Sequence, residues 1–520
     1  MNVFMALLFL ALIGAPLFVI VGAVTGVAYV DYTDTIRGFE SLGTLIDPLE
    51  DLLGKDAFLA IPLFIASGAI MTAGGLAKRL VEVAKASLSW MPGGLGIAAV
   101  VSCMVFAAIS GSSPVTLIAV GSIMYPAMVK AKYPDNFSLG LVMTAGSLGC
   151  LMVPALVLLI YAIAVSSVTK GSVDPSDMFI ASIIPAMLVA IMLSVYSYLV
   201  GRKLPGARPK FESAELIAAI RDGVWGLLLP VIVIGGILGG FLTPFKAGAV
   251  AVVYALIVTM FIYRELTLPK AIQALADAGK LMGMLILVIA LAFSFNNFLA
   301  LVGVEAAIVA LIDDWGLGPI GFMLLVNVVL IVLGALMDSI SATLIFAPIL
   351  APIAVSQYGI DPLHFGVVFV VNMEIGYLAP PVATNLFIAA ALFRKPFEQV
   401  CRAVLPGLAI TCAALVLLIY VPTLSKGLVN YTRGQDIWES FPWDGKPSEQ
   451  AESSAPTYDL DELSEKASEE ADAEGDLNEQ SDDEYYFKKG GDAGADDSGD
   501  SDDLDDDSDL DVDLNELINQ

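Results

Sequence analysis

Histidine and cysteine are scarce in this chain, and several catalytic motifs are missing. His364 is the single histidine among 520 residues, which excludes histidine-ligand metal clusters and argues against histidine acid–base chemistry. As a lone loop residue it is expected to be structural. The four cysteines have no CxxC spacing and lie in or beside apolar runs, so neither disulfides nor a zinc site is predicted. No Gly-Lys-Thr phosphate loop and no nucleophile–base set is present, which argues against ATP-driven pumping by this chain.

Charge is also scarce, except at the C-terminal end. Residues 431–520 hold 31 acidic and 5 basic side chains, a net charge of −26, whereas residues 1–430 hold 23 and 21, a net charge of −2. The chain is 57% hydrophobic, with a mean hydropathy of +0.80. These values exclude an ordinary soluble domain and predict an all-α, multi-pass membrane protein.

The acidic end lacks apolar residues. Ser453–Ser508 is rich in Asp, Glu, Ser and Gly, and such a segment cannot bury enough surface to fold alone. We predict a transmembrane domain over residues 1–425 and a largely disordered acidic tail over 426–520. The tail is expected to be solubilising or salt-adapted, with cation buffering or partner docking as the alternative. Nothing in the chain predicts nucleic-acid binding.

Apolar runs of about 20 residues predict spanning helices. The first run lacks a basic n-region and is too long for a signal peptide, so it is predicted to be a spanning helix. The predicted spans are Val3–Val30, Phe58–Ala73, Leu139–Val165, Met178–Val200, Val224–Leu242, Ala247–Tyr263, Leu281–Val302, Phe365–Leu392 and Val404–Val421.

Two further apolar stretches are interrupted near their middle. Leu95–Met128 is split at Gly111-Ser-Ser113, and Pro319–Ile353 is split at Asp338-Ser339. Each half has only about 15 to 17 residues, which is short for a span. The pattern predicts two re-entrant helical hairpins, whose irregular tips survive at membrane depth only inside protein or beside a cavity. The loops would also alternate correctly across the membrane if each half of both stretches were a full span, so this alternation does not prove re-entrance.

The two interrupted regions share a sequence pattern. Thr116-Leu-Ile118 matches Thr343-Leu-Ile345, and Gly149, Leu151 and Pro154 match Gly376, Leu378 and Pro381, all at an offset of 227 residues. A shared offset indicates a duplication, with repeats over about 1–205 and 223–425. Basic loops place the ends of the first hairpin in the cytoplasm and those of the second outside, as an inverted repeat requires. The same assignment of basic loops to the cytoplasm predicts a cytoplasmic N-terminus and an external tail.

Two amphipathic segments, Lys78–Trp90 and Glu265–Ala278, are predicted before the hairpins. They are interpreted either as arms that brace a moving element or as ordinary interfacial anchors.

The helix breaks supply the candidate site. Ending helices expose carbonyl groups that suit Na⁺, and beginning helices expose N–H groups that suit a carboxylate. Hydroxyl side chains in membrane helices can instead serve packing alone. The predicted substrate residues are Ser112, Ser113, Thr116, Pro154, Thr384 and Asn385, and the predicted Na⁺ ligands are Ser110, Gly111, Ser112, Gly149, Asp338, Ser339, Ser341, Gly376 and Pro380.

Two carboxylates lie within apolar sequence. Asp338 is predicted to be functional, because a carboxylate at membrane depth is costly. Glu374 is open to either a functional role or a structural pairing. No cofactor other than Na⁺ as the coupling ion is predicted.

At these residues the chain resembles the large membrane subunit of the tripartite ATP-independent periplasmic (TRAP) transporters, the DctM and SiaM type. The resemblance covers about residues 1–425. Its departures are Val153 and Ala155 in a segment that is usually Pro-Pro-Ser, Ala379 for a usual Thr, Ala383 for a usual Gly, and Phe245-Lys246 for a usual Thr-Glu. The resembling segments are Ile61–Gly68, Ile109–Ser113, Phe241–Pro244, Ala249–Tyr254, Gly359–Gly366, Asn372–Gly376 and Pro380–Asn385.

The resemblance implies an inverted-repeat elevator fold of the ion-transporter superfamily type, in the bacterial inner membrane. It further implies Na⁺-coupled uptake of an organic acid, a periplasmic substrate-binding protein (DctP-like) and a separate four-helix membrane subunit (DctQ-like). That subunit is not expected to be fused here, because no extra spans precede Val3. The alternatives are a carboxylate carrier that works without a binding protein, a membrane-embedded enzyme using Asp338 and Glu374, and a passive channel.

Overall fold

The structure, a computed structural model, describes residues 17–32, 56–168, 173–204, 211–304, 308–309, 315–380 and 383–441. Within these ranges it is helical and contains no strand. The first half holds α2 (Leu17–Tyr32), α4 (Asp56–Ala73), α5 (Leu76–Leu88), α6 (Gly94–Ser110), α7 (Ser113–Lys130), α8 (Asp135–Ser147), the 3₁₀ turn η2 (Leu148–Cys150), α9 (Leu156–Val168) and α10 (Pro175–Arg202). The second half holds α11 (Ser213–Leu238), α12 (Pro244–Leu256), the π-helix η3 (Ile257–Ile262), α13 (Leu268–Leu301), α15 (Pro319–Leu336), α16 (Ser339–Tyr358), α17 (Pro362–Gly376), α18 (Thr384–Phe393), α19 (Phe397–Tyr420) and α20 (Thr423–Thr432).

Most of these helices are apolar enough to cross a membrane. Among the described residues, eight helices are long and apolar enough to do so, and the bent pair α4–α5 adds a ninth candidate. This confirms the predicted class of all-α, multi-pass membrane protein. The predicted first span, Val3–Val30, is described only from Leu17 onward, where α2 begins. Its earlier part lies outside the described residues.

Both interrupted stretches break where the sequence predicts. Helix α6 ends at Ser110 and α7 begins at Ser113, while α15 ends at Leu336 and α16 begins at Ser339. The four halves have 17, 18, 18 and 20 residues, so they are longer than the predicted 15 to 17. Helices of 18 residues or more can span by length alone, and helix length therefore does not decide between re-entrant hairpins and full spans.

Two of the predicted spans are broken helices. The run Leu139–Val165 forms α8 and α9, which are separated by η2 and a short irregular segment. The run Phe365–Leu392 forms α17 and α18, with the break after Gly376. The helices α6, α7, α8 and α9 begin at residues 94, 113, 135 and 156, and α15 to α18 begin at 319, 339, 362 and 384. The four intervals of 225 to 228 residues follow the 227-residue offset of the sequence motifs.

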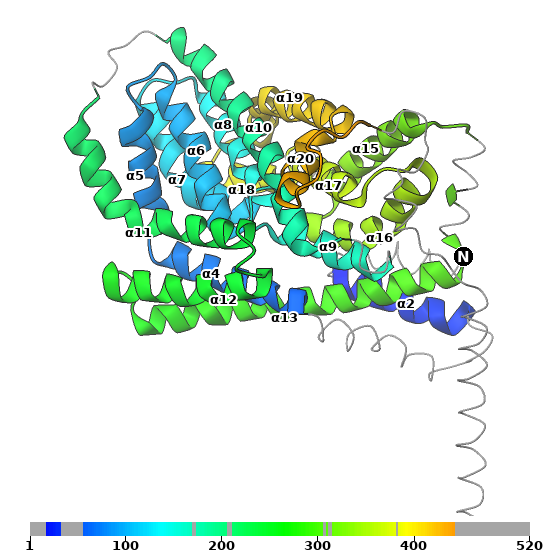
Figure 1. The fold of residues 1–520 in the computed structure, drawn as a ribbon. Helices are drawn as coiled ribbons and strands as arrows, with labels where there is room; N and C mark the ends of the chain where they lie inside the picture. The colour runs from blue at the N-terminus through cyan, green and yellow to red at the C-terminus, as the bar shows by residue number, and fades with distance from the viewer. Residues whose placement is uncertain are drawn as a thin grey trace, which may run out of the picture. The chain divides into compact units, whose positions relative to one another are not determined.

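Helices α2, α4, α12 and α13 form a layer beneath the hairpins in Figure 1, where α13 runs alongside α2 and α4. Helix α13 is continuous over 34 residues. The prediction of a separate amphipathic helix over Glu265–Ala278 is therefore wrong. Pro269 lies in the first turn, where proline is tolerated, and no later proline interrupts the helix before Leu301.

The other amphipathic segment is a separate helix, as predicted. Helix α5 follows α4 after a bend of 72°. Leu76, Leu80, Val81 and Ala84 lie on its buried face, which packs against α6 and α11. It is thus held by protein along its apolar side.

The folded body continues past residue 425, the predicted end of the membrane domain. Helix α20 packs against α10 and α17, and the buried Lys426 bonds to Asp361 Oδ2 at 2.7 Å and to Glu439 Oε1 at 2.6 Å. Burial disfavours the charged ammonium, but the two carboxylates outweigh it and raise the pKa of Lys426, so the side chain stays charged at neutral pH. The sequence prediction missed this because acidic residues dominate the average composition of the end of the chain.

His364 is buried in the first turn of α17, and its Nδ1 lies 2.8 Å from Ser425 Oγ. The prediction of a loop histidine is therefore wrong. The interaction with α20 supports the structural role predicted for it.

Lys426→Met tests the attachment of α20. The substitution leaves two carboxylates without their cation, and loss of one partner from a buried pair costs about 3–5 kcal/mol. We expect a clearly lower unfolding temperature for the purified protein in detergent. Arg402→Met is the matched control, because the Arg402–Glu398 pair is exposed and such pairs are worth about 0–1 kcal/mol. Equal unfolding temperatures for the two variants would contradict this account.

Candidate functional site

The tip of the first hairpin is a two-residue break between α6 and α7. Gly111 has φ 59°, in the left-handed region that favours glycine, and Ser112 is extended. The Gly111 N–H donates to Ala107 O and closes α6. A side chain at position 111 would also meet Pro154 O at 2.6 Å, so both the turn and its surroundings require glycine.

The hydroxyl groups of this tip bond mainly to one another. Ser110 Oγ lies 2.8 Å from Thr116 Oγ1, and Thr116 Oγ1 donates to Ser112 O at 2.8 Å. Thr116 is fully buried, whereas Ser110 and Ser112 line a cavity. The tip therefore presents a carbonyl and hydroxyl surface at Ser110 and Ser112, held from behind by Thr116.

The broken helix α8–α9 packs directly on this tip. The Leu156 N–H, at the start of α9, points to Gly111 O at 3.4 Å. A Cβ on Gly149 would lie 2.6 Å from the backbone of Ser112 and Ser113. The first tip and the first break thus form one continuous unit.

The second tip is closed by a side chain instead of a glycine. Asp338 is the N-cap of α16, and its Oδ2 accepts from Ser341 N at 3.0 Å. Ser339 donates to the hydroxyl of Tyr377 through both N (3.1 Å) and Oγ (2.9 Å). Asp338 therefore has a helix-capping role in addition to the cation role predicted for it. Tyr377 was not predicted.

The second break reaches across to the first half. Asn385 Nδ2 donates to Ser113 Oγ at 2.7 Å, and both residues are fully buried. A Cβ on Gly376 would lie 2.6 Å from the backbone of Gly334, so this break packs on the end of α15. Pro381 lies outside the described residues.

A second contact between the two halves joins positions that are equivalent in the duplication. Ser147 Oγ donates to Glu374 Oε1 at 2.8 Å, and these residues are 227 positions apart, which is the offset of the duplication. Glu374 is fully buried, and among the described residues its Oε2 has no hydrogen-bond partner. The structure thus gives Glu374 a pairing with the other half of the chain.

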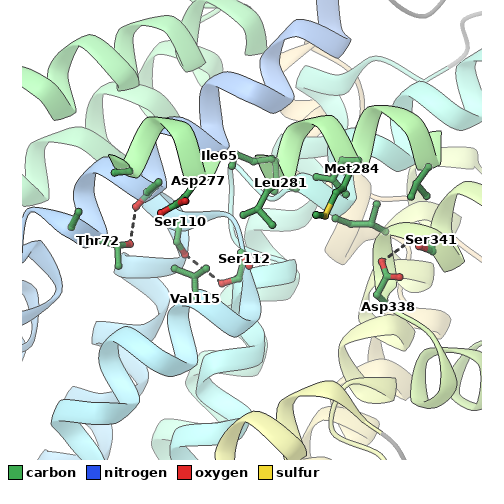
Figure 2. A pocket seen from close by; sticks show the side chains of 18 residues that line it. Ile65, Thr72, Ser110, Ser112, Val115, Asp277, Leu281, Met284, Asp338 and Ser341 are labelled. Atoms are coloured by element: carbon green, nitrogen blue, oxygen red, sulfur yellow. Dashed lines mark hydrogen bonds between the residues drawn. The ribbon is translucent and has the colours of Figure 1, made fainter. Parts of the chain in front are cut away.

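A cavity of about 710 Å³ lies between the two tips and the layer formed by α4 and α13. Figure 2 shows Ser110 and Ser112 on one side of the space and Asp338 with Ser341 on the other, below α13. None of its described lining residues is basic. The lining residues are Ile65, Gly68, Ala69, Thr72, Ala73, Ser110, Ser112, Val115, Leu156, Ala274, Asp277, Leu281, Met284, Leu285, Val288, Asp338, Ile340 and Ser341.

The cavity brings some predicted site residues together and leaves others outside. Ser110, Ser112, Asp338 and Ser341 line it, and they come from both halves of the chain. The predicted residues that do not line it are Gly111, Ser113, Thr116, Gly149, Pro154, Ser339, Gly376, Pro380, Thr384 and Asn385. Of these, Thr384 and Pro380 are exposed, and the rest are buried in the tips or in the elements packed around them.

Sequence reasoning missed Asp277, which lines the cavity from α13. A signal for it was present. Ala274, Leu281, Leu285 and Val288 recur with Asp277 at three- to four-residue intervals, so an acid lies on the otherwise apolar side of a helix.

Comparisons with known proteins agree with this architecture. The family model "Tripartite ATP-independent periplasmic transporter, DctM component" matches residues 1–424. The chain is 44% identical over 375 residues to the C4-dicarboxylate TRAP transporter large permease protein DctM of Pseudomonas aeruginosa, covering 72% of this chain and 86% of the relative. It is 38% identical over 387 residues to the Rhodobacter capsulatus protein of the same name, covering 72% and 87%.

A solved structure shows the same kind of fold. The crystal structure of the Alcanivorax borkumensis YdaH transporter matches 81% of this chain and 98% of its own, with a TM-score of 0.53. At 15% identity this is a likeness of fold alone.

Substituting the tip glycine tests the junction of tip and break. Gly111→Ala places a Cβ in a left-handed conformation, which costs about 1–2 kcal/mol, and against Pro154 O. We expect the rate of solute uptake in proteoliposomes to fall at least about tenfold, because an increase of about 1.4 kcal/mol in the activation barrier slows a step tenfold. Gly279→Ala on α13 is the control, since a Cβ there meets nothing within 4 Å. Normal uptake by Gly111→Ala would show that the tip tolerates a different geometry.

A double-mutant cycle tests the contact between the halves. Ser147→Ala, Glu374→Gln and the double variant are compared by unfolding in detergent. Residues in contact couple by about 0.5–3 kcal/mol, which is the expected interaction energy here. Ser122→Ala combined with Glu374→Gln serves as the control pair, because the Ser122 hydroxyl bonds to Ala119 O within its own helix. Additivity in both pairs would argue against the Ser147–Glu374 bond.

Proposed function

Because the chain belongs to the DctM-component family, the large permease subunits of TRAP transporters, we propose that it moves a carboxylate solute across the membrane together with Na⁺. It is a multi-pass protein of the bacterial inner membrane. The single observation that carries the mechanism is the cavity lined by both hairpin tips and by no basic side chain among its described residues.

Helix ends supply favourable positions for an anion. Ser112 and Asp338 are the N-caps of α7 and α16, and Leu156 is the first residue of α9; all three line the cavity. A helix N-terminus carries a partial positive charge and free N–H groups, which together favour a carboxylate. The starts of α7 and α9 therefore support a carboxylate site without arginine or lysine, whereas the start of α16 is already capped by the Asp338 carboxylate.

The end of α6 supports the cation role. Ser110, the last residue of that helix, lines the cavity, and the C-terminal end of a helix carries a partial negative charge. Carbonyl and hydroxyl oxygens and the Asp338 carboxylate are ligands that suit a small hard cation. Two Na⁺ ions would cancel the charge of a dianion. Each ion entering down about 100 mV contributes roughly 2.3 kcal/mol from voltage alone.

The layer behind the cavity suggests how the solute moves. Helix α13 packs against α2 and α4, and α4 packs against α12, whereas the tips pack against the broken helices. We propose that α2, α4, α12 and α13 form a fixed scaffold and that the hairpins and broken helices carry the site past it, as in an elevator. A binding protein delivers the solute, and a small membrane subunit completes the complex. The names of the two relatives favour a C4-dicarboxylate as the solute.

Asp338→Asn tests the coupling ion. Asparagine caps a helix about as well as aspartate, so the variant removes the charge and keeps the start of α16. In proteoliposomes holding the complete complex, we expect the Na⁺ concentration for half-maximal uptake to rise about tenfold, with uptake restored at high Na⁺. Unchanged Na⁺ activation would remove Asp338 from the cation site.

Two omissions in the same assay separate the alternatives. Uptake without the binding protein would indicate an autonomous carrier. Solute flux without any Na⁺ dependence in the wild-type complex would indicate a channel and would overturn the proposed coupling.

A further inference from the structure

Asp277 is a charged residue on the side of α13 that faces the cavity. Its neighbours on that side, Ala274, Leu281, Met284 and Val288, are all apolar. Figure 2 shows Asp277 on α13 in the same view as Ser110 and Ser112 of the first tip. The acid therefore lies on the wall opposite the tips, on a helix that packs against α2 and α4.

The partner of Asp277 neutralises it only weakly. Lys280 Nζ lies 3.1 Å from Asp277 Oδ1, one turn along the same helix, and the two side chains are 73% and 58% exposed. Exposed pairs of this kind are weak and screened by solvent. Lys280 does not line the cavity, whereas Asp277 does. The carboxylate thus adds negative charge at the wall of the space.

The cavity wall also holds a hydroxyl group that has no hydrogen-bond partner among the described residues. Ser341 is 4% exposed and lines the cavity, and among the described residues its hydroxyl has no hydrogen-bond partner; its N–H serves the Asp338 cap instead. Because Ser341 lines the cavity, its hydroxyl is accessible to an ion or solute bound there. Ser341 and the two carboxylates, Asp277 and Asp338, line one space without a basic side chain among its described lining.

We propose that Asp277 is a specificity-determining residue that keeps a carboxylate solute out of the cavity until Na⁺ has bound. This rests on the proposed Na⁺-coupled uptake of a carboxylate. In the cation-free cavity, Asp277 and Asp338 both repel an anion. Bound Na⁺ cancels the charge beside Asp338 and offsets the field of Asp277, so the anion enters second. The repulsion grows with the charge of the solute. The binding of a dicarboxylate therefore depends more strongly on prior Na⁺ binding than the binding of a monocarboxylate.

The test compares variants of opposite sign in the complete complex, reconstituted in proteoliposomes, with succinate as the C4-dicarboxylate. Asp277→Asn removes the negative charge, and we expect the KM for succinate at limiting Na⁺ to fall about three- to tenfold, because the coulombic repulsion of one unit charge is lost. At saturating Na⁺ the decrease in KM should be smaller, because bound Na⁺ already offsets the negative charge in the wild type. Lys280→Gln leaves Asp277 unpaired, so the KM at limiting Na⁺ should rise. Asp277→Glu keeps the charge, so its KM at limiting Na⁺ should change less than that of Asp277→Asn.

A binding measurement on the purified full chain keeps the inference testable if a variant assembles poorly. The shift in unfolding temperature with succinate gives an apparent affinity at low and high Na⁺, and the same order of variants is expected. The inference is overturned if Asp277→Asn leaves the KM at limiting Na⁺ unchanged, or if Asp277→Asn and Lys280→Gln shift it in the same direction. The proposed function fails separately, and the inference with it, if succinate uptake by the wild-type complex does not depend on Na⁺.

Discussion

A broken helix inside a membrane must have its polar ends satisfied by the protein, because hydrocarbon offers no hydrogen bonds. In the described part of the chain, the two hairpin tips and the two broken helices satisfy one another's polar groups. The N–H of Leu156 points to Gly111 O, Ser339 donates to Tyr377, and Asn385 donates to Ser113. Each bond ties a tip to a break. The convergence of the two tips on one cavity follows from this requirement.

The same requirement explains why the site lies where it does. Most hydroxyls at the tips are already used within the fold, as Thr116 is by Ser110 and Ser112. The oxygens and helix ends that remain available to a ligand lie on the side of the cavity formed by the tips, and the mostly apolar face of α13 lies opposite them. A solute that enters this space meets few competing polar groups.

The sequence predicts best where a polar residue interrupts an apolar run. Asp338 is found in this way, because a carboxylate would be costly in an uninterrupted membrane helix. Gly111 is found through the serines on either side of it. Residues whose role depends on the packing of distant helices are harder to predict. Nothing local marks Tyr377 as the partner of Ser339, or Asn385 as the partner of Ser113, which is 272 positions away. Asp277 was missed for a different reason. A charge in an amphipathic segment is ordinarily exposed to water, and only the continuity of α13 through the end of that segment places Asp277 at the cavity.

The two halves solve the same structural problem in different ways. Position 111 and its equivalent, 338, hold the same break, yet the first uses a left-handed glycine and the second an aspartate cap. Ser147 and its equivalent, Glu374, have likewise diverged into a hydrogen-bond donor and acceptor. The glycine tip exposes backbone oxygens without charge, and the aspartate tip adds a full negative charge. Once the copies differ in this way, each half contributes a part of the site that the other lacks. Neither tip can therefore replace the other, even though the order of helices around them is the same.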